Sequence, residues 1–121
     1  MHIWAPTVED VAQLVPARFG ETGPDQYTIP TYDQLEELIE RRQVSVRAEC
    51  GRIDQVDDDN ILQLASETVA VGVAAYLSAT FFPEQQNAEE AMFLRRRYEE
   101  HRRLLRRQVL LWWQANRDDL D

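Results

Sequence analysis

The acidic run DQVDDDN, residues 54–60, is the stretch whose composition comes closest to a metal-binding motif. A calcium loop of the EF-hand type needs oxygen ligands at alternating positions, a central glycine and a distal glutamate. Counted from Asp54, a ligand position falls on Val56 and the glycine position falls on Asp59. Ala65 stands in place of the glutamate. The spacing therefore excludes an EF-hand and predicts a solvated acidic loop.

Few side chains could act as a nucleophile, a general base or a cofactor ligand. Cys50 is the single cysteine, which excludes an intramolecular disulfide. The histidines are His2 and His101, and His101 falls on the apolar stripe of a helix, where packing is expected rather than metal binding. No Ser/His/Asp arrangement and no phosphate-binding glycine loop is visible in the sequence. We therefore expect no enzymatic activity, no cofactor and no metal ion.

The last third of the chain holds the groups best placed for electrostatic binding. All 13 basic residues are arginine, and the planar guanidinium makes bidentate contacts that lysine cannot. A GC-rich coding genome would produce the same bias. One side of the last helix is expected to carry six arginines, which we assign to contacts between subunits: Arg95, Arg96, Arg102, Arg103, Arg106 and Arg107.

This arginine side has three candidate uses. Glu99 and Glu100 precede Arg102 and Arg103 at i+3 and i+4 spacing, which favours a solvated salt-bridge face. The second use is an acidic surface of a neighbouring subunit, and the third is nucleic acid. The net charge of −9 disfavours a free nucleic-acid binder. The charge is also uneven, because residues 1–87 hold 15 acidic residues and 5 arginines, whereas residues 88–121 hold 7 and 8.

The composition of the chain predicts an all-α fold in a single domain, residues 1–121. Of the 121 residues, 44% are hydrophobic. The chain has only 4 glycines and 5 prolines, and few of them follow residue 30, so few turns are expected after that point. Periodicity and capping signals predict a small bundle of about four helices. The expected ranges are 7–15, 31–50, 61–82 and 88–117, with the long last helix packed antiparallel on a central alanine-rich helix.

Capping residues predict where the helices begin. Thr7 can cap the first helix, and Thr31 forms a capping box with Gln34. Asn60 or Asp59 can cap the central helix. Between the first two helices, residues 16–30 are expected to form a loop with a short extended piece at 27–29.

The central stretch, residues 61–82, is long enough to cross a bilayer. Gln63, Ser66, Glu67 and Thr68 interrupt it, however, which favours a buried helix of a soluble protein. The first ten residues lack a basic region and a long apolar run, so no signal peptide is expected. No membrane partner is predicted.

The sequence FFPEQ, residues 81–85, predicts the corner of a helical hairpin. Pro83 disfavours helical geometry at Phe82, and Asn87 can cap the last helix. Phe81 and Phe82 are expected to fill the base of the hairpin.

The last helix should extend beyond the central one. Helices of about 30 and 22 residues span roughly 45 Å and 33 Å, which leaves about two turns without a partner. Adjacent tryptophans lie about 100° apart on a helix, so one core cannot easily bury both, and an exposed aromatic patch marks a partner site. The alternative is that the N-terminal helix covers this end. The predicted partner-binding residues are Leu110, Leu111, Trp112 and Trp113.

The order of these motifs resembles the head–tail connector (adaptor) proteins of tailed bacteriophages. The resemblance covers nearly the whole chain: TVEDVA (7–12) opens a short helix, PTYDQLEELI (30–39) opens the next, an alanine-rich helix ends in FFPEQ (81–85), and a charged helix with Tyr98-Glu99 follows. The loop after Gly51 departs from the family pattern, because it is short and acidic and lacks a further glycine-rich stretch.

The resemblance implies a structural virion protein at the head–tail interface, assembled in the host cytoplasm. Such a protein forms a ring, commonly of twelve copies, between the portal and a stopper or tail protein, and DNA passes through the ring without sequence-specific binding. The family's C-terminal segment often docks on the portal, which would place Leu110–Trp113 there. The alternative from the residues themselves is a small helical regulator that binds a protein through its arginine-rich, tryptophan-containing last helix.

Overall fold

The computed structural model describes residues 4–15, 19, 23–80 and 88–120, without the side chains of 88 and 117–120. The described residues are 80% helical and contain no strand. The elements are α1 (Val8–Leu14), α2 (Tyr32–Cys50), the single-turn 3₁₀ helix η2 (Ile53–Gln55), α3 (Asp59–Thr80) and α4 (Ala88–Leu120). The prediction of an all-α bundle is confirmed.

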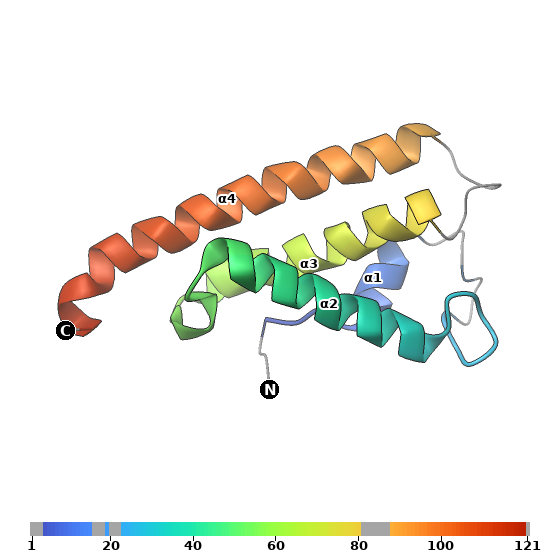
Figure 1. Ribbon diagram of the computed structural model, residues 1–121, viewed down its shortest axis with the longest axis horizontal. Coiled ribbons are helices and arrows are strands. Elements are labelled where there is room, and N and C mark those ends of the chain that lie inside the picture. Colours follow the sequence, from blue (N-terminus) through green and yellow to red (C-terminus); the bar gives the residue numbers. More distant parts are fainter. Residues whose placement is uncertain (1–3, 16–18, 20–22, 81–87, 121) are drawn as a thin grey trace.

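The bundle is arranged around α3. Figure 1 shows α4 running antiparallel along one side of α3, with α2 and α1 on the other side. A single core joins residues of all five helical elements, and its most enclosed side chains are 2% exposed or less. Five of them show how many elements contribute: Trp4, Val11, Leu35, Ile53 and Leu105.

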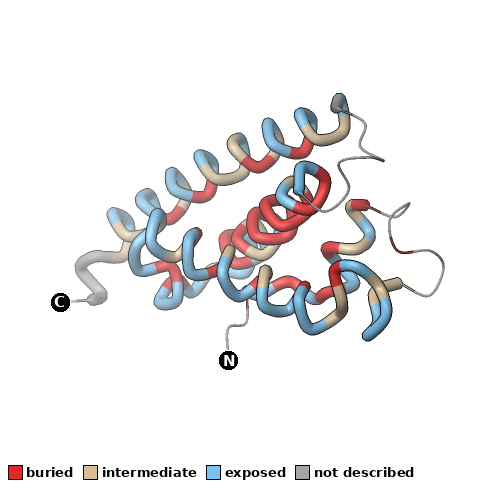
Figure 2. The backbone as a smooth tube through the Cα atoms, turned by 45° about the vertical axis from the view of Figure 1, so that its right-hand side comes forward, coloured by how far each residue is buried: buried red, intermediate tan, exposed pale blue. Residues whose placement is uncertain are grey.

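The central helix α3 is buried on most of its faces, as Figure 2 shows. A helix that is apolar nearly all round must be covered by others. Among the described residues, α3 is the one helix long and apolar enough to cross a membrane, but 67% of that apolar window is buried by the rest of the molecule. The core helix of a soluble protein passes the same test of length and composition, so this match is weak support for a membrane span.

Reciprocal capping fixes the first turns of α1 and α2 as the sequence predicts. The Thr7 hydroxyl accepts from the Asp10 amide, and the Asp10 carboxylate accepts from the Thr7 amide. Thr31 and Gln34 make the same pair of bonds at the start of α2. Each box satisfies two donors that the helix itself cannot.

The start of α3 differs from the prediction. Asp58 caps the helix, because its Oδ1 accepts from the amides of Asn60 (2.9 Å) and Ile61 (3.2 Å). The helix therefore begins at Asp59, two residues before the predicted start at 61, and is described as far as Thr80; the predicted end at 82 lies outside the described residues. The expected hairpin corner, with Phe81, Phe82, Pro83 and Asn87, lies outside the described residues.

The segment between α2 and α3 exposes most of its charged residues to solvent, as its charge predicted, but further contacts anchor it to the core. Ile53 and Val56 are buried in the core, at 0% and 4% exposed. Asp54 accepts a hydrogen bond from the Trp4 indole Nε1 (2.7 Å) and forms an ion pair with Arg47 (2.5 Å). These bonds fasten the segment to the N-terminal residues and to α2.

Three helices meet around the ring of Tyr98. This α4 residue is 8% exposed, and its hydroxyl accepts from Arg42 of α2 (3.3 Å). The Arg42 guanidinium lies 5.1 Å from the ring centre, within the range of a cation–π contact. Gly72 of α3 provides the space in which the ring lies.

Candidate protein-binding surface

One side of α4 packs on the bundle, and it follows the predicted apolar stripe. Leu94, Tyr98, Leu105 and Val109 are buried. They recur at intervals that keep them on one face of the helix. The helix extends to Leu120, beyond the predicted end at 117. With 33 residues against the 22 of α3, it is the longer helix by about 16 Å.

The opposite side of α4 carries large apolar side chains that are exposed to solvent. Phe93, Leu104 and Leu111 form a row there and are 62%, 46% and 47% exposed. Met92 and Leu110 are 54% and 58% exposed. A row of apolar side chains along one exposed helix face is typical of a surface that contacts a partner.

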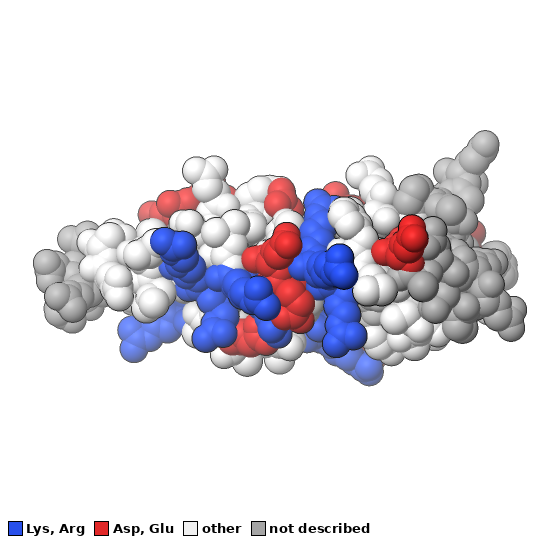
Figure 3. Space-filling model, turned by 90° about the horizontal axis from the view of Figure 1, so that it is seen from above, with Lys and Arg blue, Asp and Glu red and all other residues white. Residues whose placement is uncertain are grey.

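Five of the six predicted arginines lie on this outer side. Figure 3 looks down on α4 and shows basic side chains in clusters, with an acidic band between them. Within the described part of the chain, no ion pair shorter than 4.0 Å involves any of the five. They are exposed and lie in three groups along the helix: Arg95 and Arg96, Arg103, and Arg106 and Arg107.

Arg102 is the exception, because its guanidinium is engaged within the molecule. Its guanidinium bonds to Glu49 of α2 (3.0 Å) and to Glu99 of α4 (2.6 Å), and it lies 5.8 Å from the Tyr98 ring. Arg102 therefore holds α4 to α2 within one molecule. The predicted salt-bridge pattern is present at Glu99–Arg102.

The tryptophans lie differently from the exposed patch that the sequence predicted. Trp112 and Trp113 are partly buried and pack against the core. Their rings meet edge to face, with centres 5.3 Å apart and an interplanar angle of 85°. Arg52, just after α2, lies 5.0 Å from the Trp113 ring centre. The segment after α2 thus covers part of the α4 surface around Trp113. Sequence analysis had named the N-terminal helix as the element that could cover it.

A groove of about 490 Å³ runs between the end of α2 and the outer side of α4. Leu110 and Trp113 contribute apolar walls, and Cys50 lies at the α2 edge. Burial is the main cause that raises the pKa of the Cys50 thiol to about 11, with the charge of Glu49 adding to it. The basic residues of the groove are Arg103, Arg106 and Arg107. We call this site the α2–α4 groove.

The second exposed apolar feature lies at the other end of α2, and sequence analysis missed it. Tyr27 and Ile29 are 83% and 75% exposed in the loop that precedes α2. Asp25 organises the loop, because its Oδ1 accepts from the amides of Tyr27 (2.7 Å) and Thr28 (3.0 Å). The expected extended piece at 27–29 is thus a series of bends. The sequence did contain a signal for this loop. Asp25 lies two residues before Tyr27, and aspartate favours turns in which its side chain accepts from the backbone amide two residues on.

No group of three potential metal ligands occurs among the described residues. His101, expected to pack, is half-buried: its Nδ1 donates to the Arg97 carbonyl (2.8 Å), which leaves Nε2 facing Glu67 at 3.9 Å. His2 lies outside the described residues. The chemistry visible on the surface is therefore the pairing of arginine with apolar side chains on α4.

Comparison with known proteins found no matching family model and no significant match among curated proteins or solved structures.

Proposed function

We propose that this chain is a structural adaptor protein of the phage connector type. It forms a ring between the portal and a tail or stopper protein, extends the DNA channel, and resides at the head–tail interface of the virion. The observation that carries the proposal is the outer side of α4, where five exposed arginines alternate with five exposed apolar side chains. This mixture suits a protein–protein contact, in which arginine and large apolar residues supply most of the binding energy.

The distribution of charge supports a role beside DNA without tight binding to it. A channel that held DNA through many basic contacts would bind it with strong salt dependence. The chain instead has a net charge of −9, and its arginines on α4 are matched by the acidic residues of the first 87 positions. A contact between the arginines of one copy and the acids of the next copy would be heterologous, which is the geometry that closes a ring.

The decisive experiment is assembly with the portal protein of the same phage. Co-purification followed by negative-stain microscopy should show a ring seated on the portal. The Leu104→Ser/Leu111→Ser variant, which changes exposed positions outside the α2–α4 groove, should lose portal binding, whereas Val44→Ser, on the exposed side of α2, should retain it. Absence of any ring, with or without portal, contradicts the adaptor role.

Two other results would instead favour one of the alternative functions, a helical regulator or a nucleic-acid binder. A stable complex with an unrelated host protein, formed by a chain that stays monomeric, would favour a small helical regulator. A DNA mobility shift at physiological salt that weakens steeply as salt rises would favour a nucleic-acid binder.

A further inference from the structure

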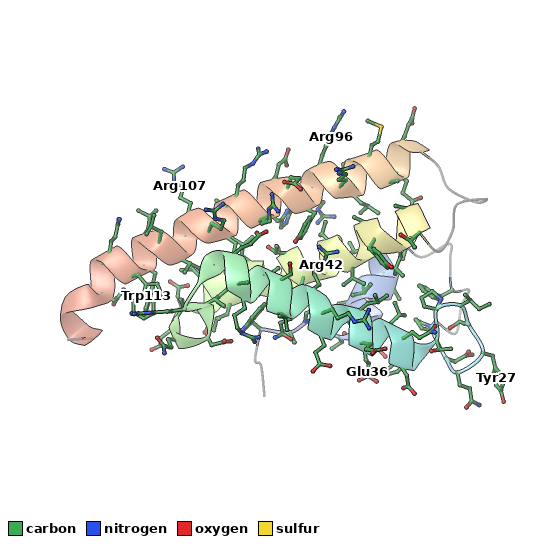
Figure 4. The ribbon with its side chains drawn as sticks, viewed as in Figure 1. Tyr27, Glu36, Arg42, Arg96, Arg107 and Trp113 are labelled. Carbon is green, nitrogen blue, oxygen red and sulfur yellow. The ribbon has the colours of Figure 1, made fainter. Side chains whose placement is uncertain are left out.

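A loop with exposed apolar side chains and the α2–α4 groove lie at opposite ends of the long axis of the molecule. Figure 4 places Tyr27 at one end and Trp113 near the other, with α2 running between them. The first feature is the loop knob, Tyr27 and Ile29. The second is the α2–α4 groove. A helix of 19 residues, about 28 Å long, separates them, so one copy cannot bring its own knob to its own groove.

We propose that the loop knob of one copy docks in the α2–α4 groove of the next copy. This contact rests on the proposed ring and identifies the surfaces that form it. The groove offers apolar walls at Leu110 and Trp113, and its volume of about 490 Å³ lies within the range of roughly 300–1,000 Å³ that pockets for small ligands occupy. The knob offers one aromatic and one branched apolar side chain of matching character.

Charge complementarity identifies a second copy as the occupant. The groove is lined by three arginines, Arg103, Arg106 and Arg107, and by one acidic residue, Glu49, whose carboxylate is paired with Arg102. Residues 23–40, which include the knob and the first half of α2, contain five acidic residues and no basic one: Asp25, Asp33, Glu36, Glu37 and Glu40. An apolar contact ringed by opposite charges is the arrangement that gives both affinity and register.

The knob is prepared for docking before any partner arrives. The Thr28 hydroxyl donates to the Pro30 carbonyl (2.8 Å), and the Tyr32 amide donates to the Asp25 carbonyl (2.9 Å). Together with the two amide bonds to the Asp25 carboxylate, they fix the loop in the shape that presents Tyr27 and Ile29 outward. A fixed loop loses little conformational freedom on binding, which increases affinity.

A head-to-tail contact predicts a distinctive result when two damaged variants are mixed. Tyr27→Ser/Ile29→Ser removes the knob, and Arg106→Glu/Leu110→Ser damages the groove. Each variant alone should show self-association at least about 10-fold weaker than the unmodified chain. Their mixture retains one intact knob and one intact groove, so it should form a heterodimer and nothing larger. Analytical ultracentrifugation measures all three samples, and circular dichroism checks that both variants are folded.

Cys50 allows the contact to be located directly, because it lines the groove and is the single cysteine. In Gln26→Cys, at an exposed position next to the knob, a bismaleimide much shorter than α2 should link the introduced thiol of one copy to Cys50 of another. Because the raised pKa of the Cys50 thiol slows its reaction, the reaction runs for the time in which N-ethylmaleimide labels Cys50 completely in Tyr27→Ser/Ile29→Ser, whose groove is open. Gln26→Cys/Cys50→Ser should give no such link, and Val44→Cys is the matched control on the exposed side of α2. Mass spectrometry of the linked peptides distinguishes this knob-to-groove product from a link between two knobs.

The outcomes separate this inference from the function on which it rests. Oligomers without the knob-to-Cys50 link, or without rescue on mixing, would overturn the knob-in-groove contact while leaving the adaptor ring in place. A groove variant that loses portal binding but self-associates normally would assign the groove to the portal and overturn the contact as well. A chain that stays monomeric, alone and with portal, would overturn both.

Discussion

The Tyr98 ring occupies the space that a side chain on Gly72 would need: a Cβ at Gly72 would lie 2.7 Å from Tyr98 Cε1 and 2.9 Å from Cδ1. These distances are well inside van der Waals contact. The ring is enclosed, so it cannot swing away, and α3 and α4 would have to separate locally. The close approach of the two longest helices thus depends on the absence of one methyl group.

Gly72→Ala should therefore destabilise the protein. Alanine gains about 1 kcal/mol in helix propensity, but overpacking a tight core costs about 1–3 kcal/mol, and the enclosed ring places this site at the upper end. We expect a net loss of about 1–2 kcal/mol in urea denaturation. Tyr98→Leu in the same chain should make the alanine less harmful, because the smaller side chain frees the space. Equal costs of Gly72→Ala in both backgrounds would show that the ring is not the cause.

Asp54→Ala should lower stability much more than Asp57→Ala. Asp54 accepts from the buried Trp4 indole and pairs with Arg47, whereas Asp57 is exposed. Removing one partner of a buried donor costs about 1–3 kcal/mol. Chemical denaturation followed by tryptophan fluorescence measures the difference. If both variants unfold at the same urea concentration, the Trp4–Asp54 bond does not hold the α2–α3 segment in solution.

The tryptophans and the neighbouring leucines should respond oppositely to mutation. Trp112→Ala/Trp113→Ala removes two side chains that pack against the core, and we expect a loss of about 3 kcal/mol or more. Leu110→Ser/Leu111→Ser alters only exposed positions and should change stability by about 0.5 kcal/mol or less. Thermal unfolding of the two double variants compares them directly. Unchanged stability in the tryptophan variant would show instead that those side chains are free to bind a partner.

The Cys50 thiol should react slowly with an aromatic disulfide reagent at about pH 8, below the ordinary thiol pKa. Its pKa is raised from 9.0 to about 11, chiefly by burial, and the thiolate is the reacting form. The thiolate population below the ordinary pKa is therefore about 100-fold smaller than for an unperturbed thiol. The rate should rise steadily with pH up to about 11, rather than levelling off near 9.0. A plateau near the ordinary pKa in the folded protein would contradict a buried thiol.

Local signals predicted the helix starts and most of the core stripes. The capping boxes at Thr7 and Thr31 involve residues three positions apart, so the sequence alone contains all their partners. The buried stripe of α4 follows the same logic, since its members, from Leu94 to Val109, recur at helical intervals. Such features depend on neighbours along the chain and hardly on the rest of the molecule.

Features that depend on distant residues were not predictable in the same way. Which arginine turns inward was set by Glu49, 53 positions before Arg102, and nothing in the spacing of the arginines distinguishes that one. Trp113 is covered by Arg52 from a different segment. In the acidic loop the charge pattern predicted the exposed residues, but it did not reveal that residues 53 and 56 are both buried.

The position of α3 at the centre also governs how the molecule should come apart. The other three α-helices all pack on α3, so no pair of them retains a core once α3 leaves its place. Partial structures that keep half of the bundle are therefore poor in buried apolar surface, and unfolding should occur in a single cooperative step. α3 and α4 follow each other in the chain, and helical bundles connected in this way fold fast.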